Sequence, residues 1–300
     1  MTRPVRSPFR DGAISRDEFA RFAAWVDSAA GIHLPERKVS LLLRRLGRRL
    51  RELELSSYGD YLDLVRADPA ERTLALDLIS TNETSFFREP KQFELLERSV
   101  LPQWRREAEE GRRETRIRAW CAACSSGEEP YSLAMLLLDQ FGDDPRWRLD
   151  ILASDLSNRV LARAHAGIFS ASRVAGRIAA PRLQRYFLRG RNANAGNLKV
   201  APEVSALVRL QSINLVADSY PVARGLDLIF CRNVLIYFRP ERRRAVVERL
   251  FALLRPGGLL LLGHAENVAG LGIGARALIP TVYERPLAAS EPELAVGARR

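Results

Sequence analysis

The sequence has few cysteines and no long apolar run, and each shortage excludes a class of protein. Three cysteines among 300 residues cannot form a disulfide framework, which favours a reducing compartment. No stretch approaches the roughly 20 uncharged apolar residues that span a bilayer, and the basic start MTRPVRSPFRDG lacks the apolar core of a signal peptide. We therefore expect a cytoplasmic protein without membrane insertion. Because 47% of its residues are hydrophobic, we also expect it to be folded.

Lysine is also scarce, so arginine supplies almost all of the formal net charge of +11. This charge predicts an acidic partner, which leaves nucleic acid, anionic lipid and acidic protein surfaces open. Acids are missing from residue 37 to residue 51, where apolar residues fall on one side of an expected helix and cations on the other. A solvated helix face normally mixes charges of both signs. We therefore predict that this face docks to an acidic surface through Arg37, Arg44, Arg45, Arg48 and Arg49.

The pattern of the chain changes at about residue 115. Before it, the first 80 residues indicate helices only, and Ser15 with Glu18 forms a capping box for the first of them. After it, apolar strands alternate with helices, which predicts a mostly parallel sheet covered on both faces. The expected strands are TRIRAWC, RLDILASD, ALVRLQSI, LDLIFCRN and GLLLLGHA, with RALIPTVYERP as a possible antiparallel edge.

These patterns predict an α/β chain in several parts. We expect a helical domain at 1–80, a linker at 81–99, an α/β domain at 100–286 and a tail at 287–300. The segment 181–210 is too long for a simple connection, and its RNANAG turn indicates a small β-insertion.

The first turn of the predicted sheet is acidic where a phosphate-binding turn would be rich in glycine. In AACSSGEEPYSL, Glu128 and Glu129 would repel a pyrophosphate and favour a cation. Asp155 ends the next strand, where an acid can accept the hydroxyls of a ribose. An adenosine with a cationic amino-acid tail suits both positions, so the strand ends predict S-adenosylmethionine. Acids and amides at strand ends also commonly cap helices, and that alternative stays open for each residue alone.

Six segments together resemble the chemotaxis receptor methyltransferases, the CheR-type protein-glutamate O-methyltransferases, over about residues 15–286. The segments are TNETSFFREP, AACSSGEEPYSLAMLL, ILASDLSNRVLARAHAGIF, LQSINL, LDLIFCRNVLIYF and LLRPGGLLLLGHAEN. The resemblance implies an S-adenosylmethionine-dependent, Rossmann-like methyltransferase domain that follows a small all-helical domain. It also implies that this chain methylates glutamates on the acidic cytoplasmic helices of chemoreceptors, and leaves S-adenosylhomocysteine as the product.

The resemblance also implies roles for particular residues. In its linker motif, Asn82, Thr84 and Arg88 approach the cofactor or the substrate. Arg88 and Tyr237 match the pair that holds the substrate carboxylate. The other matching cofactor contacts are Glu129, Asp155, Asn214, Leu215, Asn233 and Val234. The basic helix would grip the receptor, and the β-insertion binds a receptor C-terminal peptide in some members.

The expected chemistry needs neither a metal nor a general base. A glutamate side chain is already ionised at neutral pH, so it can attack a sulfonium methyl group directly. Cys121 and Cys124 form a CxxC pair, but only Cys231 remains as a further thiolate, which disfavours zinc. Phe86 and Phe87 of the linker can be anchors or a wall of the site.

Two other functions are compatible with parts of the sequence. The arginine surplus permits an RNA methyltransferase, although FCRNVLIYF matches neither a nucleophilic cysteine nor an Asn/Asp-Pro-Pro-Tyr strand end. We therefore expect no nucleic-acid partner. A scaffold that senses S-adenosylmethionine without turnover is the other alternative, and the presence of Arg88 and Tyr237 argues against it.

Overall fold

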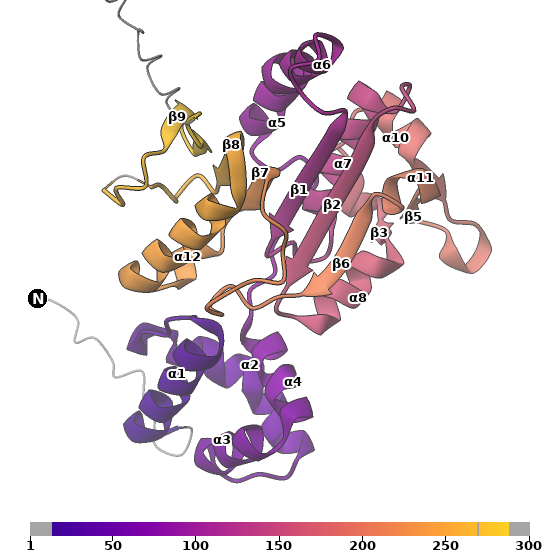
Figure 1. The fold of residues 1–300 in the computed structure, drawn as a ribbon. Coiled ribbons are helices and arrows are strands. Elements are labelled where there is room, and N and C mark those ends of the chain that lie inside the picture. Colours follow the sequence, from indigo (N-terminus) through magenta and orange to yellow (C-terminus); the bar gives the residue numbers. More distant parts are fainter. Residues whose placement is uncertain (1–13, 269, 288–300) are drawn as a thin grey trace, which may run out of the picture.

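The computed structural model describes residues 14–268 and 270–287. The expected tail at 287–300 therefore lies outside the described residues except for its first one. The described chain forms a helical bundle at one end of an α/β unit (Figure 1). No helix in the described ranges is long and apolar enough to cross a membrane.

The helical bundle contains α1 (Arg16–Ala30), α2 (Val39–Glu52), α3 (Tyr58–Ala67) and α4 (Pro69–Ile79). Ser15 and Glu18 form the predicted capping box, and Gly31 ends α1 in the left-handed conformation at φ 73°. A short 3-10 turn, η1 (Glu36–Lys38), precedes α2. The apolar sides of the helices, with Phe22 and Leu46 fully buried, form a core separate from those of the α/β unit.

The linker leads into α5 (Pro90–Leu95), the π-helical turn η2 (Leu96–Val100) and α6 (Leu101–Glu109). A seven-stranded sheet follows, in the order β6-β2-β1-β7-β8-β10-β9. Its parallel strands are β1 (Arg116–Ala122), β2 (Arg148–Asp155), β6 (Val208–Ser212), β7 (Leu226–Cys231) and β8 (Leu254–Leu262). They correspond to the five predicted strands. The expected edge strand is a pair of antiparallel strands, β9 (Arg276–Ile279) and β10 (Val282–Glu284).

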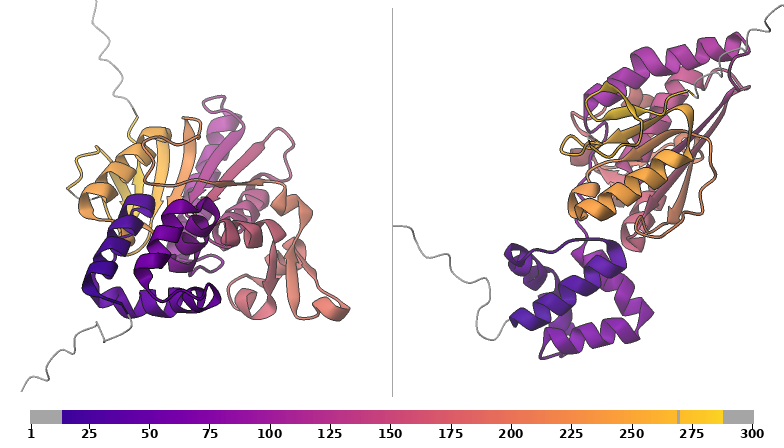
Figure 2. Two further views of the ribbon diagram at one scale, coloured as in Figure 1. Left: turned by 90° about the horizontal axis from the view of Figure 1, so that it is seen from below. Right: turned by 60° about the vertical axis from the view of Figure 1, so that its left-hand side comes forward.

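Both faces of this sheet are covered (Figure 2). The helices that follow the strands are α7 (Glu128–Phe141), α8 (Asn158–Ala166) and α12 (Pro240–Leu253). Alternation along β1 separates two cores, because Cys121 packs with α7 on one face and Trp120 packs with α12 on the other. The carboxyl ends of the parallel strands meet the helical bundle, and this edge carries the site.

The β-insertion begins earlier than the predicted range 181–210. Its three-stranded antiparallel sheet has the order β3-β5-β4, with β3 (Ile168–Ser170), β4 (Phe187–Arg189) and β5 (Asn197–Val200). The predicted hairpin around RNANAG joins β4 to β5. The short helices α9 (Ala171–Val174), α10 (Ala180–Tyr186) and α11 (Pro202–Ser205) complete the insertion. The sequence does not reveal β3, because a three-residue strand with one buried side chain, Phe169, has no detectable alternation.

Candidate functional site

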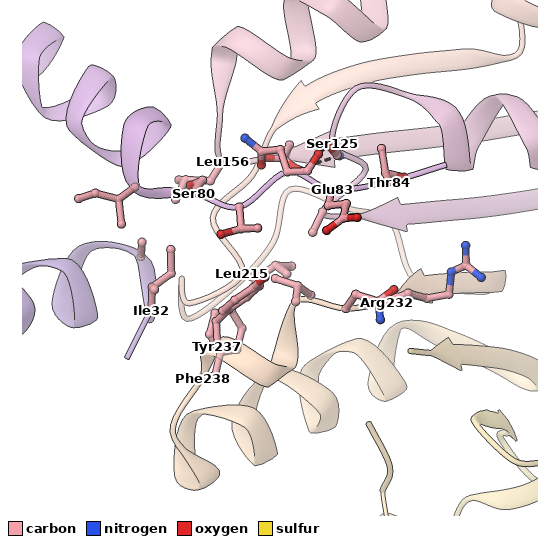
Figure 3. A pocket seen from close by; sticks show the side chains of 18 of the residues that line it. Ile32, Ser80, Glu83, Thr84, Ser125, Leu156, Leu215, Arg232, Tyr237 and Phe238 are labelled. Atoms are coloured by element: carbon pink, nitrogen blue, oxygen red, sulfur yellow. Dashed lines mark hydrogen bonds between the residues drawn. The ribbon is translucent and has the colours of Figure 1, made fainter. Parts of the chain in front are cut away.

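A cavity lies between the carboxyl ends of the parallel strands and the helical bundle (Figure 3). All ten residues predicted to contact the cofactor or the substrate carboxylate line it, although they come from five separate segments of the chain. They are Asn82, Thr84, Arg88, Glu129, Asp155, Asn214, Leu215, Asn233, Val234 and Tyr237. The sequence motifs therefore meet in one space.

The helical bundle supplies one wall of this cavity. The sequence interpretation had assigned the bundle only a role in docking to the receptor. Ile32 and Ser80 lie opposite Leu215 and Tyr237 in Figure 3. The His33 N–H donates to the carbonyl oxygen of Tyr237 at 2.8 Å. The bundle is therefore fixed to the segment that carries the predicted catalytic tyrosine.

Asn214 adds a second tie to the bundle. Its Nδ2 donates to the carbonyl oxygen of Ala29 at 2.8 Å, and its Oδ1 accepts the Val216 N–H at 3.1 Å. The side chain that was predicted to contact the cofactor thus also joins the end of α1 to the loop after β6.

The turn after β1, residues 123–129, has an unusual backbone. Ala123 and Ser125 are left-handed at φ 63° and 51°, as is Gly127 at 97°. Left-handed residues other than glycine cost free energy and persist only where surrounding contacts fix them. Asp155 Oδ2 accepts the Ser125 N–H at 2.9 Å, and Ser125 Oγ donates to the Asn82 carbonyl oxygen at 3.0 Å. These bonds join the turn to β2 and to the linker.

The two adjacent glutamates at the start of α7 point to different partners. Glu129 lines the cavity, and its Oε2 accepts from Arg232 Nε at 2.6 Å. Its Oε1 is buried, and the carboxylate also interacts with the buried Cys121 thiol. Burial raises the pKa of Glu129, although the charge of Arg232 opposes that shift. Glu128 is turned away and pairs with Arg173.

Arg232, at the end of β7, connects the site's segments, and sequence reasoning gave it no role. Its side chain is 2% exposed. Besides Glu129, its Nη1 donates to the carbonyl oxygen of Arg88 at 2.6 Å and to Gln92 Oε1 at 3.0 Å. Arg232 therefore positions both the buried acid and the main chain of the predicted catalytic arginine. The sequence feature that could have indicated this role is the position of a charged residue directly after the apolar run LDLIFC.

Glu266 is a second organising residue, to which the sequence interpretation gave no individual role although it follows a strand end. It is buried, and its Oε2 accepts the N–H groups of Asn233 at 2.9 Å and Gly263 at 2.7 Å. Its Oε1 accepts the Ile236 N–H at 3.2 Å. These bonds fix the left-handed Asn233, at φ 59°, and the 3-10 turn η4 (Leu235–Tyr237).

The two phenylalanines of the linker are anchors. Phe86 packs edge-on against Phe169 of β3 and Phe187 of β4, with ring centroids 4.9 and 5.7 Å away. Phe87 packs against Phe93, 5.1 Å away. Neither ring belongs to the cavity lining, so they hold the linker against its surroundings.

Comparisons with known proteins identify the family. The model "CheR methyltransferase, SAM binding domain" matches residues 82–276, and "CheR methyltransferase, all-alpha domain" matches residues 17–80. Chemotaxis protein methyltransferase 2 of Pseudomonas aeruginosa is 39% identical over 270 residues, which cover 90% of this chain and 93% of that protein. The chain belongs to the CheR methyltransferase family. The chemotaxis protein methyltransferase of Escherichia coli is 38% identical over 263 residues, 86% of this chain and 87% of that protein. That of Salmonella typhimurium is 38% identical over 262 residues, 86% of each.

This CheR-family chain is an S-adenosylmethionine-dependent methyltransferase of chemotaxis, and the comparisons do not favour RNA methylation or a non-catalytic scaffold. The cavity fits the cofactor. Glu129, a buried acid that lines the cavity, suits the cofactor's ammonium group. Asp155 lines the cavity where a ribose acceptor is expected, and apolar side chains such as Ile79, Leu156 and Ile213 can contact an adenine.

The five arginines predicted to dock a partner fall into two groups in this CheR-family chain. Arg45 Nη2 donates to Thr81 Oγ1 at 3.0 Å, and its Nη1 bonds the Ser80 carbonyl oxygen at 2.8 Å, so it caps α4. Arg49 forms a two-pronged ion pair with buried Glu71 of α4, at 2.9 and 2.6 Å. These two arginines are engaged inside the bundle. The solvent-exposed members are Arg37, Arg44 and Arg48.

One exposed arginine of α2 has an i,i+4 partner just beyond the acid-free stretch 37–51. Arg48 Nε bonds Glu52 Oε1 at 2.8 Å, because Glu52 follows directly after the acid-free stretch. Exposed pairs of this kind contribute little, so Arg48 can exchange partners at small cost.

Replacing Arg49 by alanine should destabilise the helical bundle by about 3 kcal/mol, because Glu71 would keep a buried charge without its cation. The Glu71 side chain is 5% exposed and also accepts from the Tyr61 hydroxyl at 2.8 Å. Amide hydrogen exchange in α2 measures this change directly. The neighbouring Arg48→Ala is the matched control, for which we expect no more than about 0.5 kcal/mol. Equal effects of both substitutions would contradict the assignment of Arg49 as internal.

The same pair predicts a pH dependence. Arg49 lowers the pKa of Glu71 in the folded chain. An acid with a lowered folded-state pKa contributes its stabilisation above its unfolded pKa of about 4.3, and that contribution is lost as the pH falls through the folded value. In Arg49→Ala, the free energy of unfolding should therefore lose the decrease at acidic pH that this pair causes in the unmodified chain.

Proposed function

We propose that this chain transfers the methyl group of S-adenosylmethionine to glutamate side chains on the acidic cytoplasmic helices of chemoreceptors. The products are glutamyl methyl esters and S-adenosylhomocysteine, and the protein acts in the cytoplasm. The observation that carries the proposal is that Arg88 and Tyr237, a cation and a phenol, line the same cavity as Glu129. A carboxylate acceptor thus has donors beside the cofactor's expected position.

The chemistry requires positioning rather than proton removal. S-adenosylmethionine, when bound, supplies a methyl group activated by its sulfonium centre. A glutamate acceptor is ionised near neutral pH, so the protein must orient the carboxylate and exclude water. Arg88 uses Nη1 to bond the Glu83 carbonyl oxygen at 3.0 Å, while Arg232 holds its main chain. A guanidinium keeps its protons in proteins and acts only as a hydrogen-bond donor. The remaining N–H groups of Arg88 can therefore bind a carboxylate without protonating it.

Docking to the acidic receptor helices is assigned to the exposed arginines of α2. Reversing the charges of Arg44 and Arg48 to glutamate should weaken methylation of a receptor fragment and leave the affinity for S-adenosylhomocysteine unchanged. Equal loss of both would contradict this role.

The insertion's edge strands β3 and β4, with Ile168 and Leu188 half exposed, are the proposed site of a receptor C-terminal peptide. Truncating that receptor end should then reduce methylation, and an unchanged rate would exclude it.

The decisive experiment combines methyl-labelled S-adenosylmethionine, the full chain and a receptor cytoplasmic fragment. Mild alkali then hydrolyses esters, and the released methanol is counted. Label that depends on the receptor and leaves as methanol supports glutamate O-methylation. Receptor label that resists alkali would contradict the proposed ester. A receptor fragment whose acceptor glutamates are replaced by alanine is the matched control, and it should take up no label.

A further inference from the structure

The β-insertion contacts the turn 123–129 through one arginine, Arg173, which is not among the site residues predicted from the sequence. Arg173 lies on α9, and its Nη2 bonds Glu128 Oε1. The Glu128 side chain is 1% exposed, whereas that of Arg173 is 47% exposed. Besides Arg173, the Glu128 carboxylate accepts only from Ser126 Oγ, at 2.7 Å, among the bonds of the described residues. Arg173 is therefore the cation that balances a fully buried charge.

The position of Glu128 makes this pair relevant to the cofactor. It directly precedes Glu129, which lines the cavity, and it begins α7 at the end of the turn 123–129. This turn holds two left-handed residues other than glycine, Ala123 and Ser125. Such a backbone is kept in place by contacts from outside the turn. Arg173 provides one of these contacts from a part of the chain about 45 residues away.

The linker is joined to the same insertion. The Thr84 carbonyl oxygen lies 3.5 Å from Arg173 Nη2, and Phe86 packs between Phe169 and Phe187 of the insertion. Thr84 itself lines the cavity. The insertion thus contacts both segments that border the cofactor on this side, the turn and the linker.

We propose that Arg173 is a positioning residue for the cofactor: by pairing with Glu128, it lets the β-insertion hold the turn 123–129 in its binding conformation. The insertion then sets cofactor affinity in addition to any role in docking. This inference concerns the cofactor alone and does not depend on which acceptor is methylated. Its physical basis is that a buried carboxylate without its cation destabilises the backbone arrangement that buries it.

Arg173→Gln should weaken the binding of S-adenosylhomocysteine by about tenfold, measured by titration calorimetry on the full chain. Arg177→Gln is the matched control, because Arg177 is an exposed arginine of the same insertion. Its affinity should equal that of the unmodified chain. The double variant Arg173→Gln/Glu128→Gln should bind better than Arg173→Gln alone, since it leaves no unpaired buried charge.

Amide hydrogen exchange without ligand separates positioning of the turn from stability of the insertion. In Arg173→Gln we expect faster exchange in residues 123–129, with β5 unchanged. Unaltered affinity, or faster exchange confined to the insertion, would overturn the proposal. Should Arg173→Gln fail to fold, Arg173→Lys keeps the charge but loses the planar fork that reaches both Glu128 and Thr84, and it should show a smaller loss of affinity. Affinity of Arg173→Lys equal to that of the unmodified chain would then count against the proposal.

Discussion

Glutamine in place of Glu129 should lower the affinity for S-adenosylhomocysteine by about a thousandfold, or about 4 kcal/mol. Glu129 is a buried acid that lines the cavity. A ligand ammonium would gain a charge-assisted hydrogen bond there, and the glutamine amide cannot replace the charge. The substitution also leaves Arg232 buried beside a neutral side chain, and its charge then repels the ligand's ammonium group.

Two ligands distinguish a direct contact from general damage to the site. Methylthioadenosine contains the adenosine part without the amino-acid tail, so its affinity should change far less than that of S-adenosylhomocysteine. Glu94→Gln is the matched control, since Glu94 is an exposed acid of α5 that pairs with Arg98. Equal losses for both ligands would contradict the assignment of Glu129 to the ammonium group.

The pH dependence of binding gives an independent measurement of the same contact. Burial raises the pKa of Glu129 in the folded chain. An acid becomes neutral as the pH falls through its pKa, so affinity for a ligand with an ammonium group should decline at a higher pH than an exposed glutamate would allow. Burial also raises the pKa of Asp155, so Glu129→Gln should keep part of this dependence and lose the rest.

The sequence predicts those parts of the fold that local contacts determine. The limits of α1 follow from Ser15, Glu18 and Gly31, all of which act within one turn of the helix ends. Four of the five parallel strands, β1, β2, β7 and β8, follow from apolar runs that are mostly buried on both faces. The fifth, β6, lies at the edge of the sheet and is only partly buried. By contrast, β3 has three residues and depends on pairing with β5, some 30 positions later, so its sequence alone gives no sign of it.

The site shows the same division between local and distant contacts. Strand-end motifs indicate which residues reach the cavity, because the fold brings all carboxyl ends to one edge. Pairings between segments stay hidden, such as Arg232 with Glu129 across 103 positions. The helical wheel of α2 likewise separates cations from apolar residues without showing that Arg45 and Arg49, one turn apart, face α4 while Arg44 and Arg48 face solvent.

Alanine in place of Arg88 should reduce kcat/KM for a receptor fragment by about a thousandfold, or about 4 kcal/mol. Arg88 lines the cavity, Arg232 holds its main chain, and its Nη1 bonds the Glu83 carbonyl oxygen, so the proposed acceptor contact would come from its remaining N–H groups. A donor in a fixed position would align the carboxylate oxygen with the methyl group, and alanine has no side-chain donor to orient it. Arg88→Lys should retain part of the activity, because an ammonium carries the charge without the two-pronged geometry.

The distribution of the loss decides whether Arg88 acts on the acceptor or on the cofactor, since both roles are predicted for it. An acceptor role requires that affinity for S-adenosylhomocysteine falls much less than kcat/KM. Equal losses would place Arg88 with the cofactor contacts and leave Tyr237 as the remaining predicted acceptor contact. Arg98→Ala is the matched control, because Arg98 is an exposed arginine that pairs with Glu94 on the helix surface. Glu129→Gln should show the opposite distribution, with the loss in cofactor affinity, so the two variants together separate the two halves of the cavity.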